Sequence, residues 1–161
     1  MHIQLYTDGA AKGNPGPGGY GVVLVCGPHR KEISGGYRLT TNNRMELLAV
    51  IVGLEAIKAA DSEVTIFSDS TYVVNAVEKG WIKQWVSTGF KKKKNVDLWF
   101  RFLDISSKYR VKFVWIKGHA GHPENERCDF LAVQAAAKIN LPDDVGYRAE
   151  ETGGDEGSLF S

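Results

Sequence analysis

The chain has 161 residues, of which 43% are hydrophobic and 24% charged, values typical of one folded domain with a substantial core. No apolar run reaches the length of a membrane span, and the N-terminus lacks the basic and apolar regions of a signal peptide. The two cysteines, Cys26 and Cys128, form no shared motif, so we expect reduced thiols in a cytoplasmic protein.

The formal net charge of +1 conceals an uneven distribution along the chain. Residues 142–161 contain six acids and one base, whereas residues 1–141 contain 19 bases and 13 acids and therefore carry a net charge of +6. We expect a folded basic domain over residues 1–141 and an acidic, flexible tail over residues 142–161. A basic body suits a polyanionic partner, although many proteins carry such charge without one.

The first 40 residues predict three strands, over residues 3–7, 20–26 and 30–39. Short connections rich in glycine and proline join them, which indicates an antiparallel meander. Asp8 follows the first strand and precedes a glycine-rich loop. This loop is not a Walker phosphate loop, because Gly18 is followed by Gly19 and Tyr20 rather than by lysine and a hydroxyl residue.

Residues 64–69 repeat the pattern of residues 3–8: an apolar strand, a hydroxyl residue and an aspartate. The segment between them predicts a helix that begins near Arg44, after capping residues 40–43, with one apolar stripe. A helix of that length can serve as a crossover, so the two strands can be parallel neighbours with Asp8 and Asp69 at the same edge. Two close carboxylates repel each other unless a cation lies between them.

Two further acids lie on helical faces lined by small residues. The face of Glu46 either lies against the sheet and directs this carboxylate to the strand edge, or leaves it in solvent, where it favours the helix dipole. Asp129 lies one turn into a helix expected to start at Pro123, again beside small side chains. The helical pattern alone leaves both interpretations of Glu46 open.

Residues 79–96 contain six lysines and no acid, interleaved with Trp81, Trp85 and Phe90. One interpretation is that the aromatic rings are core and the lysines are solvated. The other is a nucleic-acid surface, with lysines on phosphates and rings against sugars or bases. We favour the second because a carboxylate edge is predicted in the same chain.

The remaining elements are a helix over residues 70–78, a helix over residues 95–107 and a strand over residues 111–116. The helical period of the second helix directs four side chains inward: Val96, Trp99, Phe100 and Leu103. The loop after this strand carries His119 and His122, and Cys128 follows in the next helix. Their spacing fits no common zinc finger, and a catalytic zinc site would need a third partner. We interpret His119 as a proton carrier or a group that assists product release, and Cys128 as a packed thiol.

Taken together, these motifs resemble bacterial ribonuclease H type I over about residues 1–140. The matching segments, in chain order, are residues 6–9, 13–21, 40–46, 68–70, 94–99 and 117–129. The resemblance implies an α/β, ribonuclease H-like fold: a five-stranded mixed sheet, an antiparallel three-strand meander plus parallel strands, flanked by helices. It also implies an endonuclease that hydrolyses the RNA strand of RNA–DNA hybrids by a two-metal-ion mechanism, leaving 5′-phosphate and 3′-hydroxyl ends.

The resemblance also assigns roles to individual residues. It implies that four catalytic carboxylates hold two Mg²⁺ ions, with Mn²⁺ as a substitute: Asp8, Glu46, Asp69 and Asp129. It implies that His119 assists proton transfer or product departure. The resemblance implies that Asn14, Asn42 and Asn43 contact the minor groove of the hybrid and that Thr41 contacts a phosphate of the DNA strand. It also implies a handle that grips the DNA strand, formed by Trp81, Trp85, Asn95 and Trp99.

Two departures from the family pattern concern the substrate and not the metal ligands. The handle is several residues shorter than usual and collapses to the run Lys91–Lys94, and Thr71 stands where a glutamine is usual. Two alternatives stay open: a catalytically silent hybrid-binding module, and another nuclease or strand-transfer enzyme of the same fold. The presence of all four acids argues against the first, and the basic handle and Asn42–Asn43 argue against the second.

We expect a monomer with no membrane contact. The acidic tail ends in Leu159 and Phe160, two large apolar residues. Such a tail either has no function, or packs onto its own body, or serves as a short partner-binding peptide. It looks like the end of the Leu-Phe peptides that dock on the bacterial replication sliding clamp, although their usual upstream glutamine is absent.

Overall fold

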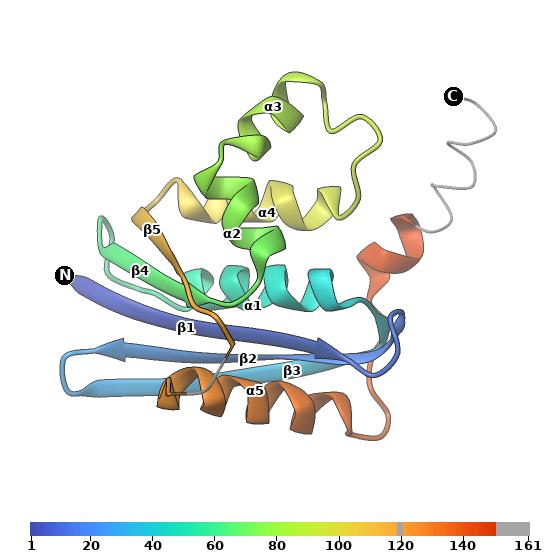
Figure 1. Cartoon of the computed structure of the whole chain (residues 1–161), viewed down its shortest axis with the longest axis horizontal. Helices are drawn as coiled ribbons and strands as arrows, with labels where there is room; N and C mark the ends of the chain where they lie inside the picture. The colour runs from blue at the N-terminus through green and yellow to red at the C-terminus, as the bar shows by residue number, and fades with distance from the viewer. Residues whose placement is uncertain (119–120, 151–161) are drawn as a thin grey trace.

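The structure, a computed structural model, describes residues 1–118 and 121–150. Its middle layer is a five-stranded sheet of order β3-β2-β1-β4-β5 (Figure 1). The strands are β1 (His2–Ala11), β2 (Gly16–Cys26), β3 (His29–Thr40), β4 (Glu63–Ser68) and β5 (Arg110–Trp115). The first three are antiparallel, whereas β4 is parallel to both β1 and β5. The expected mixed sheet, with its first strand in the centre, is confirmed.

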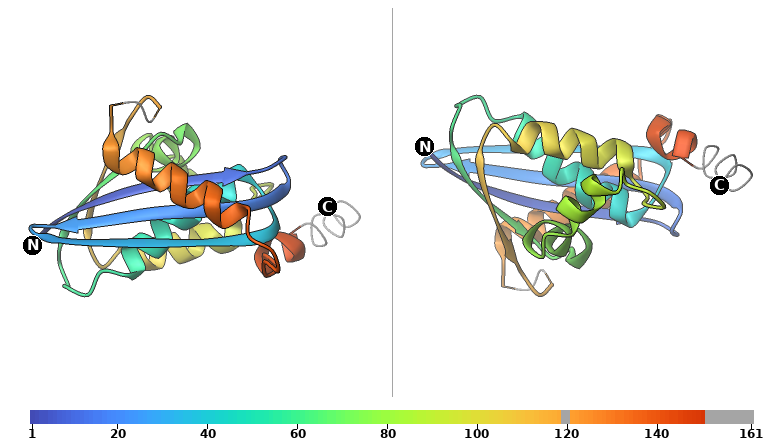
Figure 2. Two further views of the ribbon diagram at one scale, coloured as in Figure 1. Left: turned by 90° about the horizontal axis from the view of Figure 1, so that it is seen from below. Right: turned by 90° about the horizontal axis from the view of Figure 1, so that it is seen from above.

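Helices cover both faces of this sheet (Figure 2). One face carries α1 (Asn42–Glu55), α2 (Thr71–Glu78), α3 (Trp81–Ser87) and α4 (Val96–Ser106), and the other carries α5 (Pro123–Ala136). The first turn of α1 begins before Arg44, because the Thr41 hydroxyl accepts the Arg44 backbone N–H at 3.2 Å and caps the helix. Ser70 caps α2 in the same way, accepting from Val73.

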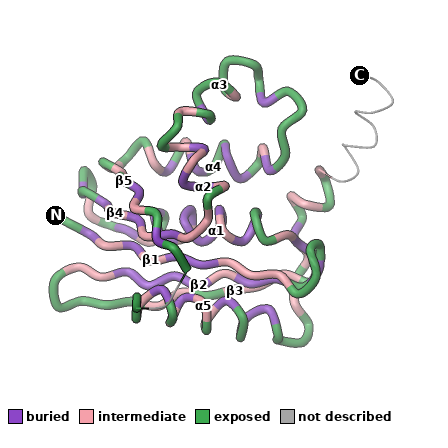
Figure 3. Tube along the Cα trace, in the orientation of Figure 1, coloured by how far each residue is buried: buried purple, intermediate pink, exposed green. Residues whose placement is uncertain are grey.

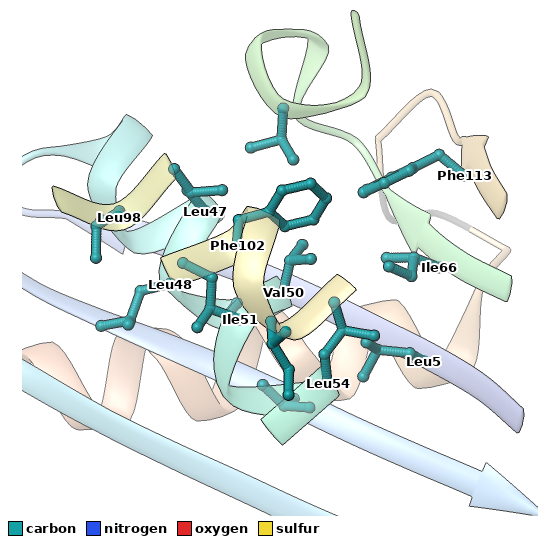
Figure 4. Close-up of a cluster of buried hydrophobic side chains, with 14 of the residues drawn as sticks. Leu5, Leu47, Leu48, Val50, Ile51, Leu54, Ile66, Leu98, Phe102 and Phe113 are labelled. Atoms are coloured by element: carbon teal, nitrogen blue, oxygen red, sulfur yellow. The ribbon is translucent and has the colours of Figure 1, made fainter. Parts of the chain in front are cut away.

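The main hydrophobic core lies between the sheet, α1 and α4 (Figure 4). We expected one apolar stripe on α1, but this helix is buried on nearly all sides, including both Leu47 and Leu48 (Figure 3). The reason is the second layer: β1 contacts one side of α1 and α4 covers the other. The helix that carries Glu46 is therefore held in place from both directions.

The expected orientation of α4 is wrong at one position. Phe100 is 57% exposed, whereas Leu98, Trp99, Phe102 and Ile105 form the buried face. Phe100 packs instead against Phe90, a buried residue of the preceding loop, with ring centroids 5.0 Å apart. This loop therefore contributes an aromatic contact that the helical period alone does not reveal.

Residues 142–150, which the sequence placed in a flexible tail, make specific contacts instead. The Pro142 carbonyl accepts the Arg38 backbone N–H at 2.8 Å, and residues 145–150 are helical. Asp144 is buried and accepts from the buried Arg44 side chain, Oδ2 to Nε, at 2.8 Å. Burial alone would lower the pKa of Arg44, but hydrogen bonds from its guanidinium to Asp97 and Asp144 outweigh this and raise it. The domain boundary at residue 141 remains a prediction.

Within the described ranges, no helix is both long and apolar enough to cross a lipid bilayer.

Candidate active site

Two of the predicted carboxylates meet at the edge where β1 and β4 run side by side. The parallel register pairs Tyr6 with Phe67. Asp8 and Asp69 each lie two residues beyond this pair, so both arrive at the same edge. The end of β4 is braced from two sides, because the Asn125 amide donates to the Phe67 carbonyl and the Trp115 indole donates to the Asp69 carbonyl, each at 3.2 Å.

Glu46 reaches this edge because α1 lies directly against β1. A Cβ atom at Gly9 would lie 2.4 Å from the Glu46 backbone nitrogen, so only glycine allows this approach. The Glu46 side chain then points toward Asp8. Of the two interpretations that the sequence left open, the structure therefore supports the inward one. Oε2 of Glu46 is buried and has no hydrogen-bond partner within the described part of the chain.

Three carboxylates consequently form one cluster. Asp8, Glu46 and Asp69 each offer a carboxylate oxygen, and these atoms all lie within 4.8 Å of one another. Over residues 1–118 and 121–150, this is the one group of three or more acidic, histidine or cysteine side chains with metal-site spacing. Asp129 of α5 joins them in lining an open hollow of about 400 Å³. All four predicted acids are thus brought to one place.

The electrostatics of this cluster favour a bound cation. Burial raises the pKa of Glu46 well above its ordinary value, and the charges of Asp8 and Asp69 raise it further. The backbone N–H of Gly9 acts in the opposite direction but does not compensate. A divalent cation among the three groups would reverse this balance, since it favours the ionised form of each. Hard oxygen donors around an open hollow therefore fit a hard divalent metal ion.

A zinc site receives no support from the described residues. Cys128 is buried, and burial raises the pKa of its thiol well above the ordinary value of 9.0, which disfavours the thiolate that binds zinc. His122 is exposed at the start of α5. His119, the predicted proton carrier, lies outside the described residues.

The sequence comparison decides the family. The family model for RNase H matches residues 1–137. The chain belongs to the ribonuclease H family. A curated ribonuclease H from Syntrophus aciditrophicus is 59% identical over 150 residues, covering 90% of this chain and 86% of the relative.

Solved structures agree with this assignment. A type 1 ribonuclease H with the type 2 active-site motif superposes with a TM-score of 0.75 at 33% identity, covering 84% of this chain and 72% of that protein. A ribonuclease H solved in complex with an RNA/DNA hybrid superposes with a TM-score of 0.63 at 30% identity, covering 83% and 96%. The mixed sheet and its helices are therefore the ribonuclease H fold.

A second hollow, of about 580 Å³, brings together several residues that we expected to contact substrate. Asn14, Thr41, Asn43 and Asn95 line it. Lys92–Lys94 line it too, so the short basic run faces the same space. Asn43 also lines the carboxylate hollow, together with Asn42. This ribonuclease H thus has an acidic and a basic hollow that share one residue at the start of α1.

Some of these polar side chains also hold the loops in place. The Asn42 side-chain oxygen accepts the Ala11 backbone N–H at 2.7 Å, and the Asn14 side-chain oxygen accepts the Asn42 backbone N–H at 3.1 Å. These bonds tie the glycine-rich loop after β1 to the start of α1. The amide nitrogens of both side chains are not used in them.

The three tryptophans of the handle differ in exposure. Trp81 is 38% exposed, and the Lys79 ammonium lies 5.5 Å from its ring centroid. Trp85 is partly buried and lies under the Lys93 ammonium at 5.1 Å. Trp99 is fully buried, so the expectation that it touches substrate is corrected: it offers no surface and supports Trp85, 5.7 Å away between ring centroids.

Tyr72 is a site residue that the sequence analysis missed. Its hydroxyl accepts from Trp99 Nε1 at 2.8 Å and from Asn95 Nδ2 at 3.1 Å, and its side chain lines the carboxylate hollow. It therefore links the acidic hollow to the basic one. Its position in α2, three residues after Asp69, is the signal that could have identified it.

Proposed function

We propose that this chain is an endonuclease that hydrolyses the RNA strand of RNA–DNA hybrids and leaves 5′-phosphate and 3′-hydroxyl ends. The observation that carries this proposal is the cluster of Asp8, Glu46 and Asp69 oxygens within 4.8 Å of one another, in a hollow that Asp129 also lines. An open acidic hollow suits a scissile phosphate only when cations offset its charge. Membership of the ribonuclease H family supports the same reaction.

The four acids Asp8, Glu46, Asp69 and Asp129 would hold two divalent cations, which we propose are Mg²⁺, with Mn²⁺ as a substitute. When bound, such ions activate water and stabilise the leaving oxygen. The chain itself supplies a fixed set of oxygens: Asp8 and Asp69 on braced strand ends, and Glu46 on a helix enclosed by the sheet and α4. Because these contacts hold the oxygens in place before substrate binds, little reorganisation is needed at the moment of reaction.

The two hollows suggest how the hybrid lies. We propose that the RNA strand crosses the acidic hollow, while a phosphate of the DNA strand enters the basic hollow near Thr41 and Asn95. Asn14, Asn42 and Asn43 lie along this region and offer amide groups suited to base edges and 2′-hydroxyls, without demanding one sequence. The exposed face of Trp81 and the partly exposed Trp85 would contact the DNA strand beyond.

For His119 we keep the role expected from the sequence, proton transfer or help in product departure. We also keep as predictions a monomeric, cytoplasmic protein and a weak sliding-clamp contact through Leu159 and Phe160. These two residues lie outside the described part of the chain.

The proposal is tested by incubating the full-length chain with labelled RNA–DNA hybrid, double-stranded RNA and double-stranded DNA, with Mg²⁺ or with a chelator. We expect cleavage of the hybrid RNA strand alone, and only with the metal. Binding without cleavage would favour a silent hybrid-binding module, and cleavage of duplex DNA would favour another nuclease of this fold. The variant Asp8→Asn controls for contaminating nucleases.

A further inference from the structure

Among the residues that the structure describes, one acidic side chain lines the basic hollow: Glu150, at the end of the helical residues 145–150. Oε2 of Glu150 accepts the backbone N–H of Asn95 at 2.6 Å. Asn95 is the N-cap residue of α4, has a positive φ of 63° and lines the hollow. A carboxylate thus lies at the N-terminal end of an eleven-residue helix, where the helix dipole favours an anion.

The surroundings of this carboxylate suit a phosphate equally well. Among the described residues that line the hollow, three are lysines, Lys92–Lys94, and Glu150 is the one acid. Thr41 and Asn43 add polar groups to the lining. A backbone N–H, several ammonium groups and neutral polar groups form the set that proteins use for the phosphates of a nucleic-acid strand.

Glu150 is delivered to this position by contacts of its own segment. Asp144 is anchored to Arg44 by two hydrogen bonds, at 2.8 Å and 3.1 Å. Gly146 lies against the second ion pair of Arg44, the one with Asp97, since a Cβ atom there would meet the Asp97 and Arg44 side chains. The helical residues 145–150 follow this anchor and end at Glu150, which lines the basic hollow.

The contact of Glu150 is not needed to neutralise Arg44. The Arg44 guanidinium already donates to Asp97 at 2.7 Å and 2.9 Å, besides its bonds to Asp144, whereas Glu150 lies 3.8 Å from Arg44 Nη1. Glu150 can therefore leave the hollow while the anchor at Asp144 stays intact. The residue that occupies the hollow, Glu150, is therefore not the residue that attaches the segment, Asp144.

We propose that Glu150 is an internal competitor for the nucleic-acid backbone: its carboxylate occupies the basic hollow in the free protein and is displaced when a DNA-strand phosphate enters. The proposal rests on the proposed function, which places that phosphate in this hollow. Displacement costs binding free energy, so Glu150 weakens the affinity for every polyanion. A ligand that also occupies the acidic hollow makes additional contacts, and these offset the cost of displacing Glu150. A ligand that reaches only the basic hollow makes no such contacts and bears the full cost.

The test compares full-length Glu150→Ala with a control of equal charge change, Asp104→Ala, whose exposed side chain lies near the other end of α4. We expect Glu150→Ala to lower KM for hybrid about three- to tenfold at low ionic strength, with kcat unchanged. Binding of a single-stranded oligodeoxynucleotide, measured by fluorescence anisotropy, should tighten by at least as much. Asp104→Ala should leave both quantities unchanged.

A second measurement, on the wild-type protein, tests the displacement of Glu150 even if Glu150→Ala perturbs folding. In the wild-type protein, with metal chelated, hybrid is titrated while the backbone amide resonance of Asn95 and the side-chain carboxyl resonance of Glu150 are followed. Both should shift together as Glu150 leaves Asn95. Retention of the Glu150 signal in the saturated complex, or a KM unchanged by Glu150→Ala, would overturn the inference. Absence of hybrid cleavage by the wild-type protein would instead overturn the proposed function.

Discussion

Gly21 of β2 lies directly beneath the Cys128 carbonyl of α5: a Cβ atom at Gly21 would be 2.2 Å from that oxygen. Gly21 is also the register partner of Asp8, and Cys128 immediately precedes Asp129. The absence of a side chain at Gly21 therefore sets how closely α5 approaches the central strand. This approach determines the separation of Asp129 from the other three carboxylates.

We predict that Gly21→Ala reduces both stability and activity. The added methyl group meets the Cys128 carbonyl group and the Leu131 Cβ atom, both in α5, so α5 has to move, at a cost of about 1–3 kcal/mol in the free energy of unfolding. The shift of Asp129 should lower kcat and raise the Mg²⁺ concentration needed for half-maximal cleavage. Urea unfolding and a metal titration of cleavage measure the two effects.

Gly53→Ala is the matched control. Its Cβ would also be tight, 2.4 Å from the Leu5 Cδ1 atom, but it meets a side chain at the far end of α1 from Glu46. It should lower stability without changing the metal requirement. If both variants changed the metal requirement equally, the effect would be global destabilisation rather than displacement of Asp129.

The positions of Asp8 and Asp69 were predictable from the sequence because both follow apolar strands joined by a crossover helix, and parallel strands end at the same edge. The direction of Glu46 was not, since a helical face of small residues suits either sheet contact or solvent. The close approach at Gly9, a contact between residues far apart in the chain, decides between the two.

Other features depend on contacts between residues that are distant in the sequence, which a local sequence pattern does not predict. Charge composition placed residues 142–150 in a flexible tail, but one buried arginine, Arg44, binds Asp144 from about a hundred residues away. The family resemblance placed Trp99 in the handle, whereas the helical period directed it inward. The structure agrees with the helical period, because Trp99 is buried, Tyr72 accepts its indole N–H and neighbouring rings enclose it. A family resemblance alone does not distinguish an aromatic ring that faces a ligand from one that faces other rings.

We predict that replacing Lys92, Lys93 and Lys94 by glutamine raises KM for hybrid, with little change in kcat, because these lysines line the basic hollow and not the acidic one. Each lost phosphate contact should reduce the log–log salt slope of binding by about 0.7–0.9. Fluorescence anisotropy over a range of salt concentrations measures this slope.

The control for this variant replaces three exposed lysines that do not line the basic hollow, Lys31, Lys58 and Lys108. It alters the net charge by the same amount and should leave the slope nearly unchanged. An equal loss in both variants would mean that overall charge, and not the basic hollow, governs binding.

We predict that Glu32 contributes stability that is lost in acid. The hydrogen bond from Arg127, together with one from Arg30, outweighs desolvation and lowers the pKa of Glu32 from 4.5 to about 2. A lowered folded-state pKa stabilises the protein above pH 4.5, and this contribution disappears as the pH falls from 4.5 toward 2. Because the pair is partly exposed, we expect at most about 1 kcal/mol.

The variant Glu32→Gln should therefore have a Tm about 2–4 °C below that of the wild type at neutral pH. Thermal unfolding followed by circular dichroism at several pH values measures this difference. The gap should close as the pH falls below 4.5. A gap that stays constant down to pH 3 would mean that Glu32 stabilises α5 through packing rather than through its charge.

The central claim, that the carboxylate cluster holds the cations that cleave RNA, is tested most directly by Asp8→Asn with labelled hybrid in Mg²⁺. Asp8 is the buried member of the cluster, and the amide keeps its shape while removing its charge. We predict that cleavage falls by more than about 10³-fold, while the Kd for hybrid changes by only several-fold, since binding depends on phosphate and groove contacts. Turnover close to that of the wild type would contradict the account.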